Sequence, residues 1–412
     1  MTYKGARRLL PQIAHDLNVD AVVEGTVLRA GDKVRITAQL ILAPADKHLW
    51  AKSYEGELRD ALALQNEVAR SIASEIRVEL TPREDAALRS GRPMNPLALE
   101  PFLKGRYFWN RRTADGLRQA IDYFQQAIEK DPNYAAAYAG LADAYALAGD
   151  WQYGVLAPRV AYPKAKEAAM KAVSLSADLG EAHISLAWCL EGFEWNWEAA
   201  GNEFVKGLGF APGYATGHHW YGWHLATIGR HREAIIELEK ARNLDPLSLI
   251  IGADLGEELL IAHRNDEALA QIRKTIRMDP FFAMAHFVLG EVLVQKQMNT
   301  EAIAEFQKAI ELSPGSVAFS ANLAHAYAVS GNKHEAKAIL NNLRNQSRLD
   351  SSKAPQIALV YVGLQDNDQA MAFLEKAYED RFNPGVLMRP AFDPLRSNPR
   401  FGMLLRRMGL NP

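Results

Sequence analysis

A proline recurs at a fixed interval through the second half of this chain. Pro212, Pro246, Pro280 and Pro314 are equally spaced along the sequence. Pro132 precedes the first of them by more than two intervals, so one unit lacks its proline and the stretch carries an insertion. Ala177 stands where the missing proline belongs. A period of roughly 34 residues predicts a stack of small units, each adding core to its neighbours.

Small and apolar residues precede each proline at constant spacings of four, three and five residues. The sets are Ala120–Phe124–Ala127–Pro132, Ala234–Leu238–Ala241–Pro246, Ala268–Ile272–Thr275–Pro280 and Ala302–Phe306–Ala309–Pro314. The first three members of each set share one face of a helix, and the proline ends that helix. Another small residue lies twelve positions before the alanine of a set: Gly222, Gly256, Gly290 and, before Ala336, Ala324. Each unit therefore predicts helix A, a short turn and helix B, with the small residue letting the two helices approach.

These positions resemble the tetratricopeptide repeat (TPR) family. Its Leu-Gly pair is matched by Leu255–Gly256 and Leu289–Gly290, and in part by Tyr221–Gly222, while Tyr145 and Tyr327 match its aromatic position. The resemblance covers residues 98–383. It implies a mainly α fold, a right-handed superhelical TPR solenoid of about eight helix pairs. The expected units are residues 98–132, 133–177 with the insertion, 178–212, 213–246, 247–280, 281–314, 315–349 and 351–383.

Residues 1–90 have a different pattern and predict a small α/β domain. A helical stretch at 6–17 precedes β-branched residues that alternate around a turn at 30–32, as in a β-hairpin. Residues 48–56 predict a third strand, and residues 64–80 have the period of an amphipathic helix, giving the order α-β-β-β-α. Residues 91–97 are the predicted linker to the repeats.

This segment resembles the later part of the TolB-N-terminal-like domain that precedes repeats in many bacterial regulators. The residues that carry the resemblance are VVEGTVLRAGDKVRITAQLI (22–41) and HLWAKSYEGELRDALALQNEVA (48–69). Because that domain normally begins further upstream, the resemblance implies a partial domain and a missing upstream part of a longer regulator. The sheet would then keep an unpaired edge. At the other end, residues 384–412 predict a capping segment for the last repeat.

Charge and composition exclude several function classes. The 47 basic and 49 acidic side chains give a formal net charge of -2, and no Lys/Arg block predicts nucleic-acid binding. No apolar run is long enough for a membrane span, and the single cysteine, Cys189, allows no intrachain disulfide. The chain as written is expected to be soluble, with the cytoplasm favoured and membrane tethering left open for a longer parent protein.

The sequence predicts no catalytic site, no metal site and no cofactor. His218, His219 and His224 cluster, with His231 nearby, but their spacing does not place them on one helix face with further ligands. Phosphate-binding loops, nucleophile elbows and zinc-protease motifs are absent from the sequence. The pair Glu257–Glu258 is interpreted as part of a solvated helix surface. The chain is therefore not expected to be an enzyme.

Binding is predicted on the A helices, whose second, fifth, ninth and twelfth positions line the concave groove of such a solenoid. The predicted partner-binding residues are Trp188, Glu191, His219, Trp223, Glu257, Phe287, Glu291 and His325, and Asp143 and Ile184 hold equivalent positions. Aromatic side chains on a rigid wall favour a peptide ligand, and the acidic side chains favour a basic partner. Burial between repeats (for Trp188, Trp223 and Phe287) and simple solvation (for the acids) remain the alternatives. Lys, Arg and Asn are absent from these positions, which disfavours a clamp for a terminal carboxylate.

The favoured function is a protein–protein interaction scaffold that binds a peptide or protein in its groove, as the sensory or assembly part of a bacterial regulator. The alternative is a nucleotide-responsive regulator or enzyme subunit with a site in the N-terminal α/β segment. A non-functional remnant is the third possibility. The sequence gives neither the identity of the partner nor the oligomeric state.

Overall fold

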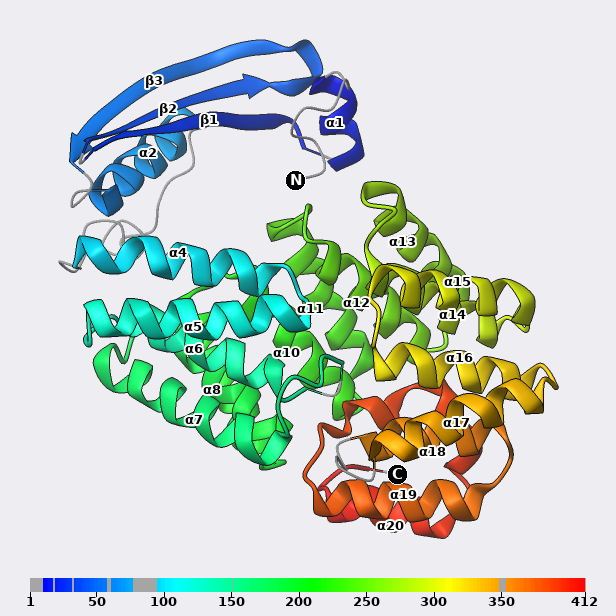
Figure 1. Ribbon diagram of the computed structural model, residues 1–412. Helices are drawn as coiled ribbons and strands as arrows, with labels where there is room; N and C mark the ends of the chain where they lie inside the picture. The colour runs from blue at the N-terminus through cyan, green and yellow to red at the C-terminus, as the bar shows by residue number, and fades with distance from the viewer. Residues whose placement is uncertain are drawn as a thin grey trace. The chain divides into compact units, whose positions relative to one another are not determined.

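The computed structural model describes residues 10–17, 19–31, 33–57, 61–76, 95–150, 152–347 and 353–411 (Figure 1). The predicted opening of the chain (residues 1–5), most of the predicted linker (91–94) and the boundary between the last two repeats (348–352) lie outside the described residues. Backbone contacts divide the chain into two compact units: residues 1–101 with 129–132, and residues 102–128 with 133–412.

The described residues of the N-terminal unit form a three-stranded antiparallel sheet with a helix before it and a helix after it in the chain, as predicted. The elements are α1 (Leu10–Leu17), β1 (Ala21–Ala30), β2 (Lys33–Leu42), η1 (Ala43–Ala45), β3 (Lys47–Glu57) and α2 (Ala61–Glu75). The strand order is β1-β2-β3, with Ala21 opposite Leu42 and Lys33 opposite Glu57. Gly31 forms the hairpin turn with φ 62°, while the predicted turn residue Asp32 lies outside the described residues. Leu64 of α2 packs on Gly56 of β3, so α2 covers one face of the sheet.

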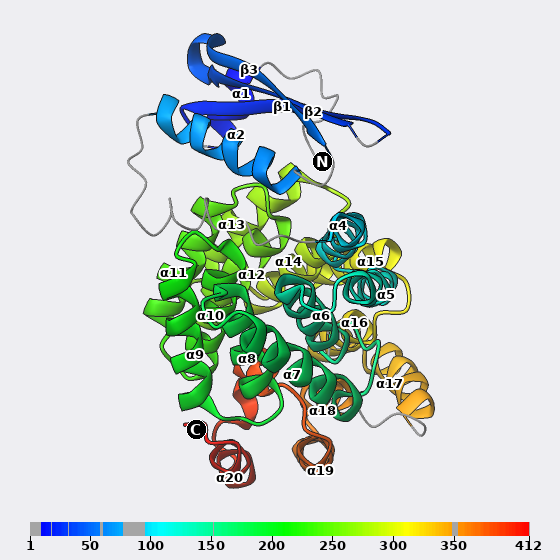
Figure 2. The ribbon, with the colours of Figure 1, turned by 90° about the vertical axis from the view of Figure 1, so that its left-hand side faces the viewer.

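The described residues from Pro96 onward form a stack of eight helix pairs, in agreement with the predicted solenoid. The A and B helices of successive pairs are α4 (Pro96–Asn110) and α5 (Ala114–Lys130), α6 (Ala135–Ala148) and α7 (Pro158–Leu175), α8 (Gly180–Gly192) and α9 (Trp197–Phe210), α10 (Ala215–Thr227) and α11 (His231–Leu244), α12 (Leu249–Ile261) and α13 (Asn265–Met278), α14 (Ala283–Gln295) and α15 (Asn299–Leu312), α16 (Val317–Val329) and α17 (Lys333–Ser347), and α18 (Ala354–Gly363) and α19 (Asn367–Glu379). Consecutive A helices lie against one another, as α6, α8 and α10 do in Figure 2.

The turn between helix A and helix B repeats its backbone geometry as well as its sequence spacing. Residues of positive φ recur in these turns at the same interval as the prolines: Trp195, Gly229, His263, Gln297, Gly331 and Gln365. The amide after such a residue bonds back to helix A, for example Arg264 N to the Leu259 carbonyl at 2.8 Å and Met298 N to the Leu293 carbonyl at 2.9 Å. This left-handed cap ends helix A and turns the chain into helix B.

The small residues of the repeat lie at the A–B contact. Ala234, Leu238 and Ala241 of α11 are 0% exposed, and a Cβ added at Gly222 of α10 would meet Leu238 Cγ at 2.8 Å. Pro246, Pro280 and Pro314 lie just beyond the ends of α11, α13 and α15. The local pattern therefore builds a continuous core from one pair to the next.

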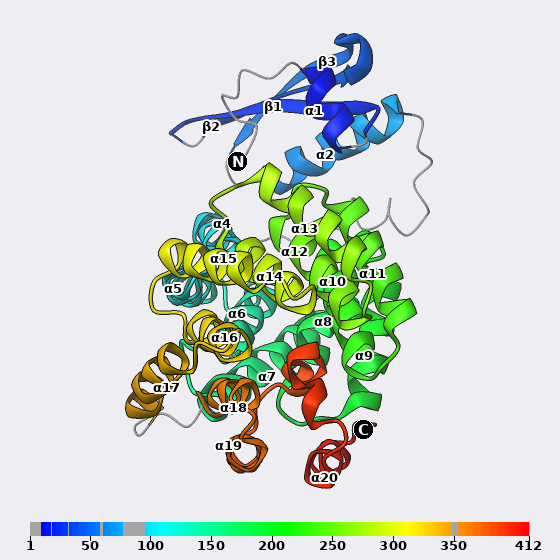
Figure 3. The ribbon, with the colours of Figure 1, turned by 90° about the vertical axis from the view of Figure 1, so that its right-hand side faces the viewer.

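Two segments depart from the regular repeat. The insertion in the second pair forms a loop after α6 that contains Asp150 and Tyr153, and it extends the start of α7. The C-terminal segment comprises η4 (Pro384–Met388), η5 (Pro390–Leu395) and α20 (Pro399–Arg407). Figure 3 shows this segment in red; η4 contacts α10 and η5 contacts α18. No helix among the described residues has the length and apolarity that crossing a membrane requires.

Candidate binding groove on the inner helices

The A helices of the first, third and fourth pairs carry aromatic side chains that contact one another. Trp188 of α8 stacks on Trp220 of α10, with ring centres 4.9 Å apart, and Trp109 of α4 meets Trp220 edge-on at 6.2 Å. Trp223, one turn after Trp220, donates its Nε1 hydrogen to Asp254 Oδ2 of α12 at 3.0 Å. The stacked rings come from three different repeats, so they fix the relative positions of these A helices.

Buried carboxylates alternate with these rings, and histidines hold three of them. His219 Nε2 lies 2.6 Å from Asp254 Oδ2, His224 Nδ1 2.7 Å from Glu191 Oε2, and His231 Nδ1 2.9 Å from Glu258 Oε1. The fourth histidine of the sequence cluster, His218, lies 2.5 Å from Glu237 Oε2. Each histidine thus pairs with a different carboxylate. Within the part of the chain that the structure describes, no three His, Cys, Asp or Glu side chains converge in a way that could hold a metal ion.

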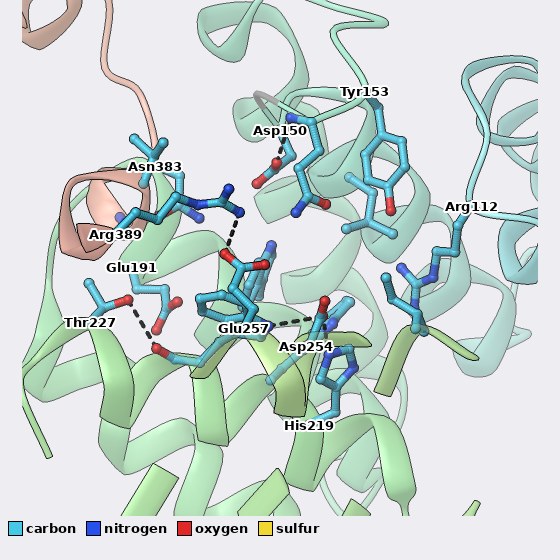
Figure 4. A pocket seen from close by; sticks show the side chains of 18 residues that line it. Arg112, Asp150, Tyr153, Glu191, His219, Thr227, Asp254, Glu257, Asn383 and Arg389 are labelled. Carbon is cyan, nitrogen blue, oxygen red and sulfur yellow. Dashed lines mark hydrogen bonds and ion pairs between the residues drawn. The ribbon is translucent and has the colours of Figure 1, made fainter. Parts of the chain in front are cut away.

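Arg389, between the two C-terminal 3₁₀ helices, enters the groove from the chain's own end. Its guanidinium forms ion pairs with Glu257 of α12 and Glu291 of α14, the second at 2.7 Å. These three side chains are 5%, 0% and 7% exposed, so the charges meet away from water. The guanidinium carbon also lies 5.2 Å from the ring centre of Phe287. One arginine therefore joins two repeats through two buried carboxylates and a ring face. Figure 4 shows its ion pair with Glu257.

Further contacts hold the same segment against the third repeat. Trp195 donates its Nε1 hydrogen to the Phe382 carbonyl at 3.1 Å, and Trp197 donates to the Met408 carbonyl at 2.7 Å. Trp195 also belongs to one apolar cluster with Leu387 and Phe392. The segment therefore does more than the predicted capping of the last repeat, because it also runs back to the third, fourth and fifth repeats.

A cavity of about 50 Å³ remains between the segment and the inner helices. Its wall includes Leu147, Asp150, Gln152 and Tyr153 from the second pair and Trp188, Glu191, His219, Trp220, Trp223, Thr227, Ile250, Asp254 and Glu257 from the next three A helices, together with Arg112, Asn383, Gly385, Val386 and Arg389. Figure 4 shows the labelled side chains directed into this space. The segment thus closes one side of a polar cavity.

Burial alters the acidity of several groups around the cavity. It raises the pKa of Asp150 to about 6, against hydrogen bonding from the Gln152 amide. It also raises the pKa of Glu191, although His224 opposes the change, and raises that of Glu257 well above its usual range. Asp143, deeper in the second pair, has its pKa raised to about 6 by burial, with Arg106 acting in the opposite direction. Burial thus makes these carboxyl groups harder to ionise than carboxyl groups in water.

The structure brings most of the predicted partner-binding residues together. Trp188, Glu191, His219, Trp223 and Glu257 line the cavity, and Glu291 and His325 line a smaller space beside Arg389. Phe287 is fully buried under Arg389. The equivalent positions Asp143 and Ile184 are buried as well, and Asp143 accepts a hydrogen bond from Ser185 Oγ at 2.5 Å.

One interpretation of the sequence is wrong. Glu257 and Glu258 do not belong to a solvated helix surface, because both are 0% exposed. The physical reason is that each has a cationic or titratable partner from elsewhere, Arg389 for Glu257 and His231 for Glu258. Glu191 and Glu291 are also buried, so solvation does not explain Glu191, Glu257 or Glu291 in the groove.

Sequence reasoning missed several residues of the cavity: Arg112, Asp150, Tyr153, Asp254, Asn383 and Arg389. Asp254 carried a usable signal, because it is an acid directly after the apolar and small residues LIIGA of α12. Asp150 and Tyr153 lie in the insertion, whose conformation no repeat pattern specifies. Arg389 gave no signal, since its partners lie in repeats far from it in the chain.

The fold and the site define a helical-repeat protein with a small polar cavity on its inner face. Sequence models of the tetratricopeptide repeat family match residues 123–154, 254–317, 293–354 and 356–379. The repeats that these models match are therefore tetratricopeptide repeats. The resemblance of residues 22–69 to a TolB-N-terminal-like domain stays a prediction.

Three comparisons with individual proteins add detail. The chain is 34% identical over 139 residues to putative adenylate cyclase 3 of Rhizobium meliloti (strain 1021), which is 34% of this chain and 24% of that protein. It is 28% identical over 151 residues to transcriptional regulator HilA of Salmonella typhimurium, covering 37% and 27%. These matches span about a quarter of each relative. Among solved structures, the crystal structure of the APC/C hetero-tetramer Cut9-Hcn1 covers 85% of this chain and 63% of that chain at 18% identity, with a TM-score of 0.52, which supports the fold.

Proposed function

We propose that this chain is a protein-interaction scaffold whose inner helices bind a peptide segment with a basic side chain flanked by apolar residues. The observation that carries the proposal is the position of Arg389, between Glu257 and Glu291 on the inner face. A peptide with the required chemistry already occupies this surface, and it is the chain's own C-terminal segment. A partner of the same chemistry would replace it.

The chemistry of the position selects an arginine or lysine. Two carboxylates on neighbouring A helices face one cation, and a neutral or acidic side chain there would leave both buried acids without a counter-charge. The planar guanidinium can reach both carboxylates and lie over the Phe287 ring at the same time. Arginine is therefore preferred over lysine.

The apolar neighbours of Arg389 supply the rest of the recognition. Leu387 and Phe392 are 0% exposed, and Val386 is 7% exposed. Burial of such side chains contributes roughly 1.5–3 kcal/mol each. A partner segment that combines a central arginine with apolar residues on both sides would compete with the internal one, and the outcome depends on relative affinity.

We further propose that this binding serves a bacterial regulator. Support comes from the names of the two relatives, an adenylate cyclase described as putative and a transcriptional regulator. The activities of those proteins are not assigned to the described residues of this chain.

Displacement of the internal segment tests the binding proposal. The probe is a fluorescent peptide with the sequence of residues 380–397, added to the full chain and followed by fluorescence anisotropy. The wild-type chain should bind it weakly, because the internal copy competes at an effective concentration of the order of millimolar. Arg389→Glu in the chain places a negative charge against Glu257 and Glu291, so it should release the internal copy and increase peptide binding at least tenfold. Arg406→Glu, at an exposed position of α20, is the matched control.

The specificity of the site is tested in the same assay. Adding Glu257→Gln and Glu291→Gln to the Arg389→Glu chain should abolish the gain, and a peptide whose own Arg389 is replaced by glutamate should not bind. Equal binding of both peptides, or equal effects of Arg389→Glu and Arg406→Glu, would show that the groove does not recognise the arginine.

A further inference from the structure

The cavity beneath the C-terminal segment contains polar atoms that lack partners. Asp254 Oδ1, the second oxygen of Glu257, Trp188 Nε1 and Arg112 Nε have no hydrogen-bond partner among the described residues. All four residues line the same space, and Asp254, Glu257 and Trp188 are 5%, 0% and 6% exposed. Each unsatisfied buried polar group costs about 1–3 kcal/mol. Four of them around one cavity therefore indicate a missing polar occupant.

These atoms divide into acceptors and donors. Asp254 and Glu257, on successive turns of α12, offer carboxylate oxygens, while Trp188 and Arg112, from α8 and the turn before α5, offer N–H groups. An occupant that satisfies both sets needs at least one donor and one acceptor. The other oxygen of Asp254 is already engaged by His219 and Trp223, which fixes the direction of the carboxylate.

The charge of the wall favours a cationic donor. The cavity is lined by four acidic residues, Asp150, Glu191, Asp254 and Glu257, and by two arginines, Arg112 and Arg389. Arg389 is shared with a further acid, Glu291, and the aromatic rings of Trp188, Trp220, Trp223 and Tyr153 complete the wall. Acidic groups and ring faces together are the surroundings that stabilise an ammonium group out of water.

We propose that this cavity is a binding site for a small molecule that combines an ammonium group with a hydrogen-bond acceptor. The ammonium lies against Asp254 Oδ1 and Glu257, and the acceptor receives hydrogen bonds from Trp188 Nε1 and Arg112 Nε. Because one water needs roughly 10–15 Å³ of such space, a cavity of about 50 Å³ holds about three to five non-hydrogen atoms. Ethanolamine, an amino alcohol, and glycine, an amino acid, have this size and share this chemistry.

The acidity of the wall agrees with an occupant of positive charge. Burial raises the pKa of Asp150 to about 6 and raises that of Glu257 well above its usual range. A bound ammonium would lower both pKa values, because a nearby positive charge favours the ionised form of a carboxyl group. The ionised carboxylates would in turn attract the ammonium.

Isothermal titration calorimetry and thermal unfolding of the full chain test the proposal with a panel of small probes. Ethanolamine and glycine carry both groups, ethylamine carries the ammonium alone, acetate carries the acceptor alone, and ammonium chloride controls for salt. We expect ethanolamine or glycine to raise the unfolding temperature by a few degrees at saturating concentration, ethylamine to act more weakly, and acetate not to act. The stronger of ethanolamine and glycine distinguishes an amino alcohol from an amino acid.

Variants separate the two halves of the site. Trp188→Phe keeps an aromatic ring but removes the donor, so it should weaken ethanolamine binding more than ethylamine binding and reduce the advantage of ethanolamine. Asp254→Asn should weaken every amine at least tenfold. Asp245→Asn, an exposed aspartate after α11, is the matched control.

Hydrogen exchange provides a readout that does not depend on affinity. Asn383, Gly385 and Arg389 form one side of the cavity, so an occupant should slow exchange of the amides in that stretch. If no amine of the panel binds, if acetate binds as well as glycine, or if Trp188→Phe affects ethylamine and ethanolamine equally, the cavity holds water alone and the proposal is wrong. These measurements contain no peptide, so they test the cavity separately from peptide binding.

Discussion

Gly256 and Gly290 hold the same position in consecutive A helices, yet alanine should have opposite effects at the two sites. An added Cβ at Gly290 would lie 2.7 Å from Phe306 Cε1 and 2.8 Å from its Cδ1 and Cζ. At Gly256 the nearest atoms belong to Ile272 and lie at 3.6 Å, which is ordinary contact. Phe306 is 1% exposed and packs against Phe287, with ring centres 6.0 Å apart, so it has little room to move aside.

The magnitude follows from two competing terms. Replacing glycine by alanine inside a helix stabilises it by about 0.8–1 kcal/mol. Forcing an extra methyl group into a close-packed contact costs typically ~1–3 kcal/mol. Gly256→Ala should therefore raise the free energy of unfolding by nearly the full helix contribution, while Gly290→Ala should lower it by about 1 kcal/mol. The two variants should then differ in their free energy of unfolding by about 2 kcal/mol, which is close to the typical cost of the methyl contact alone.

Urea unfolding of the full chain, followed by circular dichroism at 222 nm, measures this difference. Because a long repeat array need not unfold in one step, hydrogen exchange of α12 and α14 should localise each effect. Gly256→Ala should slow exchange in α12, and Gly290→Ala should speed it in α14. A shift of both variants in the same direction would refute the claim that Phe306, rather than the repeat position, decides the outcome.

Three further predictions concern acidity and turn geometry. Burial lowers the pKa of His325 to about 4, so the folded state binds fewer protons than the unfolded state between roughly pH 6.5 and 4. Stability should therefore fall as pH falls through that window. His325→Leu should flatten the dependence of unfolding temperature on pH there. Burial raises the pKa of Asp150 to about 6, so stability should instead fall as pH rises from about 4 to above 6, and Asp150→Asn should raise the unfolding temperature at pH 7.5 but not at pH 4. Gln297 has φ 60°, and Gln297→Gly should therefore raise the urea midpoint slightly. Ala304→Gly inside α15 should lower the midpoint, because it lowers the free energy of unfolding by about 1 kcal/mol.

The repeat fold was predictable because its information is local. Positions such as Ala268, Ile272 and Thr275 recur within one helix, and all three are at most 1% exposed. The left-handed turn residues follow the same interval, although only Gly229 and Gly331 show it in the sequence. The pattern does not specify whether each glycine position tolerates a larger residue. Gly256 and Gly290 are equivalent in the repeat, but their neighbours Ile272 and Phe306 differ in shape.

The candidate site was predictable only on the repeat side. The register of the A helices placed Trp188, His219 and Trp223 on the inner face, and they line the cavity. The second half of the site comes from the C-terminal segment, and no periodicity connects Arg389 with Glu257. Without that partner in view, an acid on a helix is most simply interpreted as solvated, which is why the sequence alone does not predict the burial of Glu257.

The energetics of the Arg389 ion pairs distinguish a purely structural contact from one that a partner can displace. Withdrawing three charged side chains from water costs several kcal/mol per ion, and well-packed apolar residues in place of a buried ion pair are often neutral or stabilising by roughly 1–4 kcal/mol. If the segment served only to brace the solenoid, Glu257→Met, Glu291→Leu and Arg389→Met together should keep or raise the unfolding temperature without any functional loss. The proposed function predicts the same stability for this triple variant, but it also predicts that the variant no longer binds an arginine peptide. Binding should stay absent even when a further change, Leu387→Asp, weakens the contact of the internal segment. Binding of that peptide by the apolar variant, measured by anisotropy as for the single charge reversal, would mean that the two carboxylates do not form the recognition site.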